Sequence, residues 1–177
     1  MFYDKIPVYE DGLTEALFRG DVIAAPTVML TDQTIKKFGL YDETLAFEDW
    51  EYWLRVATGD GNINYLNSPV VGYRELEFSD SHHGKGKEEE KKYNRILESE
   101  EKLLLKYRPL MKNKSMDEYW NRTLKYCIDR DYNQTVKTIL KTKEFNLDPR
   151  SKLMVFSYRT HTYWLTSKIW MKIRHGL

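Results

Sequence analysis

One stretch, residues 47–57 (Phe-Glu-Asp-Trp-Glu-Tyr-Trp-Leu-Arg-Val-Ala), constrains the fold of this chain more than any other. Its apolar residues recur at the i, i+3, i+4, i+7 spacing of one helix face: Trp50, Trp53, Leu54 and Ala57. The acidic pair Glu48 and Asp49 falls where that helix begins. Carboxylates are favoured there by the helix dipole and by unpaired backbone N–H groups. The stretch therefore predicts an amphipathic helix with two carboxylates held at its N-terminus.

Two interpretations of this acidic pair follow from the residues themselves. Glu48 and Asp49 could form the acidic first turn that many helices carry, with no further role. Alternatively, a carboxylate held at a fixed point can act as a base that takes a proton from a substrate. The sequence that surrounds Glu48 and Asp49 is needed to distinguish these two interpretations.

Composition excludes several classes of protein. Of the 177 residues, 31% are charged and 41% are hydrophobic, and the net charge is +1 at pH 7. This composition is typical of a soluble globular protein, and it provides no overall positive charge for binding nucleic acid. No apolar run reaches the roughly 18 residues of a membrane-spanning helix. The N-terminus lacks a signal-peptide pattern, and the single cysteine, Cys127, cannot form an internal disulfide. We expect a cytoplasmic protein, either free or peripheral on the inner face of the membrane.

The first part of the chain alternates between apolar runs and helical segments. Residues 22–30 form a nearly unbroken apolar run, and residues 63–73 resume this character. The first run predicts a buried strand, which Pro26 places at a sheet edge or a bulge, and the second predicts strand character in two pieces around Pro69. Between them, Thr31 begins a short helix that Gly39 ends, and the acidic helix follows. The pattern predicts an α/β arrangement.

The second part of the chain is helical throughout. A polar loop at residues 79–86 precedes it, and from residue 87 the apolar residues follow a helical period. Three further helix starts are indicated by cap residues: Ser115, Asp131 and Asp148. We predict an α/β fragment in residues 1–80 and an all-α helical bundle in residues 81–177, with helix dominant overall.

Four segments of the first part follow one another in an order found in a known family. They are the apolar run 22–30, the phrase Phe-Gly-Leu-Tyr-Asp-Glu at 38–43, the acidic motif and helix at 48–57, and Val-Gly-Tyr-Arg at 71–74. Together they resemble the C-terminal, acceptor-side part of the family 2 inverting glycosyltransferases. The resemblance implies that residues 1–80 are a fragment of a GT-A, Rossmann-like domain.

The resemblance also implies an activity. Enzymes of this family transfer a sugar from a nucleotide-sugar donor to an acceptor hydroxyl with inversion, and a glycan or glycolipid of a bacterial cell surface is the expected acceptor. A divalent cation, Mg or Mn, is expected in the full-length enzyme and not on this chain alone. The nucleotide-binding half, which carries an Asp-x-Asp metal motif in this family, is absent here. The one Asp-x-Asp in the sequence, Asp129-Arg130-Asp131, lies at a predicted helix junction. The isolated chain is therefore expected to be inactive.

Catalytic roles come to two residues through the same resemblance. Asp49 corresponds to the general base that takes the proton of the acceptor hydroxyl, and Glu48 would orient this base or bind the acceptor. The repulsion between the two carboxylates would raise the pKa of Asp49, whereas the helix N-terminus would lower it. The sequence leaves the balance of these two effects open.

Binding roles are implied for five further residues. Trp50, Arg55 and Arg74 are candidate acceptor-binding residues, and His82 and His83 are candidate metal ligands. All of them except Arg74 have a plainer alternative. The Trp50 ring could pack in the core, Arg55 could pair with Glu51 at the i, i+4 spacing, and the histidines could be exposed loop residues.

The C-terminal segment, residues 149–177, has a charge pattern of its own. It contains no acidic residue and interleaves six Lys and Arg residues with aromatic and aliphatic ones. A basic, aromatic helix of this kind suits an anionic membrane surface. The alternative is a terminal helix packed on its neighbours with a solvated basic face, and no nucleic-acid partner is expected. A non-enzymatic helical interaction or membrane-surface module is therefore the second functional hypothesis.

Overall fold

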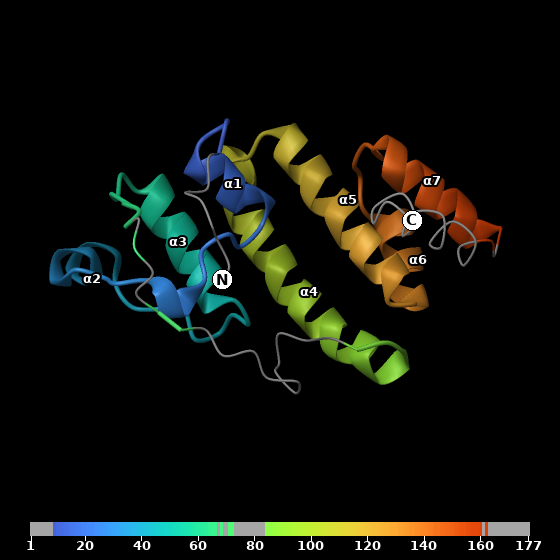
Figure 1. The fold of residues 1–177 in the computed structure, drawn as a ribbon, viewed down its shortest axis with the longest axis horizontal. Coiled ribbons are helices and arrows are strands. Elements are labelled where there is room, and N and C mark those ends of the chain that lie inside the picture. The colour runs from blue at the N-terminus through green and yellow to red at the C-terminus, as the bar shows by residue number, and fades with distance from the viewer. Residues whose placement is uncertain (1–8, 67, 69–70, 73–83, 161, 163–177) are drawn as a thin grey trace. The chain divides into compact units, whose positions relative to one another are not determined.

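The computed structural model describes residues 9–66, 68, 71–72, 84–160 and 162, and all regular elements in these ranges are helical (Figure 1). In chain order they are α1 (Leu13–Arg19), the 3₁₀ turn η1 (Ala25–Thr27), α2 (Asp32–Phe38), α3 (Glu48–Thr58), α4 (Lys87–Tyr107), the 3₁₀ turn η2 (Arg108–Leu110), α5 (Asn113–Asp129), α6 (Asn133–Thr142) and α7 (Pro149–Arg159).

The chain divides into two compact units, which we call unit 1 and unit 2. Unit 1 comprises Met1–His83 and Lys91–Ser115, and unit 2 comprises Gly84–Glu90 and Met116–Leu177. Helix α4 contributes its first turn to unit 2 and the remainder to unit 1. The domain boundary predicted after residue 80 lies outside the described residues and stays a prediction.

The predicted GT-A, Rossmann-like α/β fragment is wrong, because no strand occurs in the described ranges. Residues 22–30 contain the short turn η1 instead, with Pro26 in its first positions, and Met29 is 84% exposed. The described residues of the 63–73 run are also irregular. An apolar run becomes a strand only if a neighbouring strand pairs with its backbone N–H and C=O groups. No such neighbour exists in the described part of the chain.

Several helix ends match the predictions, since their signals lie within a few residues of the end. The hydroxyl of Thr31 accepts a hydrogen bond from the backbone N–H of Thr34, and Gly39 ends α2 with a positive φ of 79°. Similarly, the Asp148 carboxylate accepts from the backbone N–H of Ser151 at the start of α7. These local caps confirm the predicted starts of α2 and α7 and the predicted end of α2.

Two predicted caps are wrong. Helix α5 begins at Asn113, so Ser115 lies inside it, where its hydroxyl donates to the Glu15 carboxylate at 2.8 Å. Asp131 sits in the α5–α6 connection with a φ of 60°, and α6 begins after Tyr132. In both cases a tertiary contact or the geometry of the connection overrides the local cap signal.

The core of unit 1 forms where α1 and α3 pack together, with α2 beside α3 (Figure 1). The Trp50 indole N–H donates to the backbone carbonyl of Leu17 at 2.7 Å, and that of Trp53 donates to the carbonyl of Ile23 at 3.2 Å. Helix α4 adds the buried residues Leu103, Leu104 and Tyr107 to this core. Trp50 therefore fixes α3 to α1, and Trp53 fixes α3 to the loop after α1.

Unit 2 packs α5, α6 and α7 around an apolar core. Its buried residues include Leu124, Cys127, Ile128, Val136 and Ile139. The burial of Cys127 agrees with its position on an apolar helix face. No helix among the described residues combines the length and the apolar character that crossing a bilayer requires.

Candidate functional site

The predicted acidic helix is confirmed as α3, which carries Glu48, Asp49 and Glu51 in its first turn. Phe47 precedes it without a side-chain cap. A helix turns by about 100° per residue, so Asp49 and Glu51 project about 200° apart. The first turn of α3 therefore places its carboxylates in different surroundings, which decide what each can do.

Asp49 is half-buried and has no cationic partner among the described residues. Its Oδ1 accepts a hydrogen bond from the backbone N–H of Trp50 at 2.8 Å. Burial raises the pKa of the Asp49 carboxyl; the Trp50 N–H opposes this shift, and the charge of Glu48 adds to it. Glu48 itself is exposed. Asp49 is thus a carboxylate with an increased affinity for a proton.

Tyr41 is a site residue that the sequence did not single out. Its ring meets the rings of Tyr52 and Trp53 edge-on, with centroid distances of 4.9 and 6.3 Å. Burial raises the pKa of the Tyr41 hydroxyl, and the charge of Asp49 contributes to the shift. Tyr41 therefore lies along the same side of α3 as Asp49. Its only signal in the sequence is its place in the Phe-Gly-Leu-Tyr-Asp-Glu phrase.

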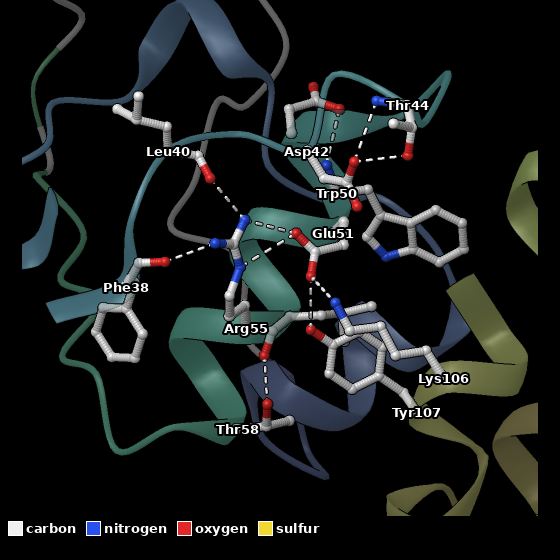
Figure 2. A network of polar contacts seen from close by, with 12 residues as sticks. Phe38, Leu40, Asp42, Thr44, Trp50, Glu51, Arg55, Thr58, Lys106 and Tyr107 are labelled. Atoms are coloured by element: carbon white, nitrogen blue, oxygen red, sulfur yellow. Dashed lines mark hydrogen bonds and ion pairs between the residues drawn. The ribbon is translucent and has the colours of Figure 1, made fainter. Parts of the chain in front are cut away.

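Glu51 has the opposite surroundings, although it follows Asp49 by only two residues. Its side chain is completely buried and accepts hydrogen bonds from Arg55 at 2.7 Å, Lys106 at 2.6 Å and Tyr107 at 3.0 Å (Figure 2). Burial by itself would raise the pKa of Glu51, but these donors outweigh it and hold the pKa below its usual value. Glu51 is a fully bonded anion that joins α3 to α4.

Arg55 connects the Glu51 cluster to the loop that carries Tyr41. Its Nη1 donates to the carbonyl of Phe38, and its Nη2 donates to the carbonyl of Leu40 at 3.0 Å and to Glu51 (Figure 2). Nε also donates to Glu51, at 3.2 Å. The ion pair with Glu51, one of the two alternatives for Arg55, is thus present. An acceptor contact by Arg55 stays a prediction, and in this structure all three guanidinium nitrogens already donate to protein atoms.

The structure places Trp50 in the core of unit 1. Its side chain is 1% exposed, and its ring meets that of Phe47 edge-on at 6.4 Å. This is the packing role that the helical spacing allowed. The acceptor-binding role of Trp50 stays a prediction, and the burial of the ring argues against stacking on a sugar.

The remaining predicted site residues, Arg74, His82 and His83, lie outside the described residues. Within the described ranges, no group of three His, Cys, Asp or Glu side chains is placed to hold a metal ion. The divalent cation therefore stays a prediction for the full-length enzyme.

Comparisons with known proteins add no further assignment, since no protein-family model, curated protein or solved structure matches this chain. The residues and the geometry of unit 1 are therefore the observations from which a function can be inferred.

Proposed function

We propose that this chain supplies the acceptor-side base of an inverting glycosyltransferase, with Asp49 as that base. One observation supports the proposal most directly. Asp49 is a half-buried carboxylate with a raised pKa that is paired with no described cation. A general base needs both an affinity for a proton and an oxygen that is not already engaged by a cation. The sequence resemblance of the phrase at 38–43 and of the acidic motif at 48–57 supplies the reaction class, since neither depends on the strand that is not formed at residues 22–30.

The proposed chemistry is a single displacement at the anomeric carbon of a nucleotide sugar. The acceptor hydroxyl loses its proton to the Asp49 carboxylate while its oxygen forms a bond to the anomeric carbon. The bond from that carbon to the nucleoside diphosphate breaks, and the leaving group departs with the bonding electrons. Inversion follows because attack and departure occur on opposite faces of the sugar. The donor and the glycan or glycolipid acceptor belong to the full-length enzyme in this proposal.

The neighbouring carboxylates are poorer candidates for the base. Glu51 already accepts hydrogen bonds from three charged or hydroxyl donors, so a further proton would have to displace them. Glu48 is exposed, so water solvates its charge and competes with an acceptor hydroxyl. Glu48 can still influence the reaction, because its charge contributes to the raised pKa of Asp49.

The test is transfer activity of the full-length enzyme that contains this chain, with Asp49→Asn as the variant. The amide keeps the shape of the side chain but cannot take the proton, so we expect kcat to fall by about 10²- to 10⁴-fold. Glu43→Gln is the matched control, since Glu43 is an exposed carboxylate of the preceding loop. Its activity should stay near wild type.

Near-wild-type transfer by Asp49→Asn, with an unchanged circular dichroism spectrum, would exclude Asp49 as the base. A second readout concerns the 177-residue chain alone. We expect no transfer from a nucleotide sugar by this chain, and measurable turnover would contradict the assignment of the donor site to other residues of a larger enzyme.

A further inference from the structure

Helix α7 exposes two large apolar side chains while it buries two serines beside Val155. Phe156 is 65% exposed and Leu153 is 44% exposed, whereas Ser151 and Ser157 are buried. The buried hydroxyl of Ser151 has no hydrogen-bond partner among the described residues. A helix that only needed to pack on its own unit would bury the phenylalanine and expose the serines. This pattern indicates that the exposed side of α7 meets an apolar environment other than the residues that the structure describes.

Basic side chains share that side of α7. At about 100° per residue, Lys152, Leu153, Phe156 and Arg159 fall within an arc of about 120°. All four are exposed. We call these four residues the α7 patch. It combines two cations with two large apolar groups.

The sequence segment that contains the α7 patch carries charged side chains of one sign only. Residues 149–177 contain no acidic residue. The acid that precedes them, Asp148, is engaged by Lys125 at 2.8 Å and by the backbone N–H of Ser151. An anionic partner would therefore meet cations without a competing carboxylate from this segment.

We propose that the α7 patch docks on the surface of an anionic phospholipid bilayer. Phe156 and Leu153 enter the boundary between headgroups and acyl chains, and Lys152 and Arg159 bind the lipid phosphates. Single-stranded nucleic acid would use the same cations, but it stacks on aromatic faces and gains nothing from an exposed leucine. The proposal is independent of the role of Asp49, since it rests on residues of unit 2 alone.

The experiment is co-sedimentation of the 177-residue chain with vesicles. One set contains phosphatidylcholine only, and the other also contains phosphatidylglycerol. We expect binding to the anionic vesicles that weakens as salt is added, because salt screens the attraction at the surface. Binding to the neutral vesicles should be at least about tenfold weaker, since each basic residue near an anionic surface contributes on the order of a fivefold gain.

Two double variants test the α7 patch itself. Lys152→Glu with Arg159→Glu should reduce binding by at least about tenfold. Leu153→Ser with Phe156→Ser should also reduce it by about tenfold, since this variant removes the apolar groups that enter the bilayer. The charge-matched control is Lys137→Glu with Lys141→Glu, two exposed lysines of α6. The apolar control is Leu105→Ser, which removes a leucine that is 73% exposed on α4.

Several outcomes would overturn the proposal. Absence of binding to anionic vesicles would do so, as would α7 patch variants that bind like wild type or lose no more binding than their controls. In that case, a docked C-terminal segment or another partner would cover the exposed side of α7. Binding of single-stranded RNA, lost in the charge variant, in the absence of vesicle binding would assign the patch to nucleic acid instead. Circular dichroism of each variant checks that the helices remain.

Discussion

The two sides of α3 show how differently one helix can treat carboxylates that are two residues apart. Asp49 is half-buried, has no described cation beside it, and has a raised pKa. The side chain of Glu51 is fully buried, yet its pKa is lowered, because Arg55, Lys106 and Tyr107 all donate to it. Burial therefore does not by itself decide whether a carboxylate keeps its charge. The donors that accompany the burial decide it.

This difference separates a chemical role from a structural one. The Glu51 cluster joins α3 to α4 and, through Arg55, to the carbonyls of Phe38 and Leu40. It thereby holds the loop that places Tyr41 along the Asp49 side of the helix. We infer that Glu51 positions the site and that Asp49 is the group available for chemistry. The following substitutions test this division.

Removal of the buried anion should have the largest effect on stability. We expect Glu51→Ala to lower the free energy of unfolding by about 2–4 kcal/mol, because it breaks a buried ion pair and leaves the Tyr107 hydroxyl without its acceptor. The value is below that of a fully buried pair because Arg55 and Lys106 are 27% and 53% exposed and can be hydrated. Urea unfolding followed by circular dichroism measures the change.

Glu48→Ala is the matched control for this substitution. Glu48 lies in the same helical turn but is exposed, so its removal should cost no more than about 1 kcal/mol of helix-dipole stabilisation. Equal losses in the two variants would show that the Glu51 cluster contributes nothing beyond an exposed acid.

A smaller effect is expected from the neutral member of the cluster. Tyr107→Phe removes one buried donor from Glu51 and should cost about 1–2 kcal/mol in the free energy of unfolding. Tyr65→Phe is the control, because Tyr65 is half-exposed and the same atom is removed. If urea unfolding showed no difference between the two variants, the hydroxyl of Tyr107 would not stabilise Glu51.

The smallest expected change in stability is that of Asp49→Asn, and its sign is opposite to the change expected for Glu51→Gln. The folded pKa of Asp49 is raised, so its ionisation opposes folding once the pH rises through that pKa. Asp49→Asn should therefore increase stability at neutral pH, by less than about 1 kcal/mol. The folded pKa of Glu51 is lowered, so its stabilisation is present at neutral pH and is lost as the pH falls through the folded pKa. Glu51→Gln should therefore decrease stability at neutral pH.

Both differences should shrink toward acid pH, where the two carboxyls are protonated in the folded and the unfolded chain. Urea midpoints measured between neutral pH and the acid limit of folding would follow this trend. A decrease in stability of Asp49→Asn at neutral pH would contradict the raised pKa and, with it, the proposed affinity of Asp49 for a proton.

The parts of the fold that could be predicted depend on contacts between residues close in sequence. The start of α3, the caps at Thr31 and Asp148 and the glycine end of α2 all follow from side-chain and backbone groups at most four positions apart. The strands expected at 22–30 and 63–73 could not be decided in this way. An apolar run is equally compatible with a strand and with irregular backbone until its pairing partner is known.

In the candidate site too, the features that could be predicted depend on local contacts, and the others depend on residues distant in sequence. The helical period and the helix dipole located Asp49 and Glu48 at the start of α3, and the same period allowed both the packing of Trp50 and the pairing of Arg55 with Glu51. Nothing in the sequence near α3 indicated that Tyr41 would lie along the Asp49 side of the helix. Its position depends on the path of the loop, which Arg55 holds through two backbone carbonyls.

The sequence by itself therefore determined where the acidic helix begins and which face of it is apolar, because both depend on the 3.6-residue period and on the groups of a single turn. Only the tertiary structure decided which carboxylate is paired with cationic and hydroxyl donors. The donors Lys106 and Tyr107 lie 55 and 56 residues from Glu51 along the chain. A carboxylate's pKa depends on the groups within a few ångströms in space, and for Glu51 most of these come from a distant helix.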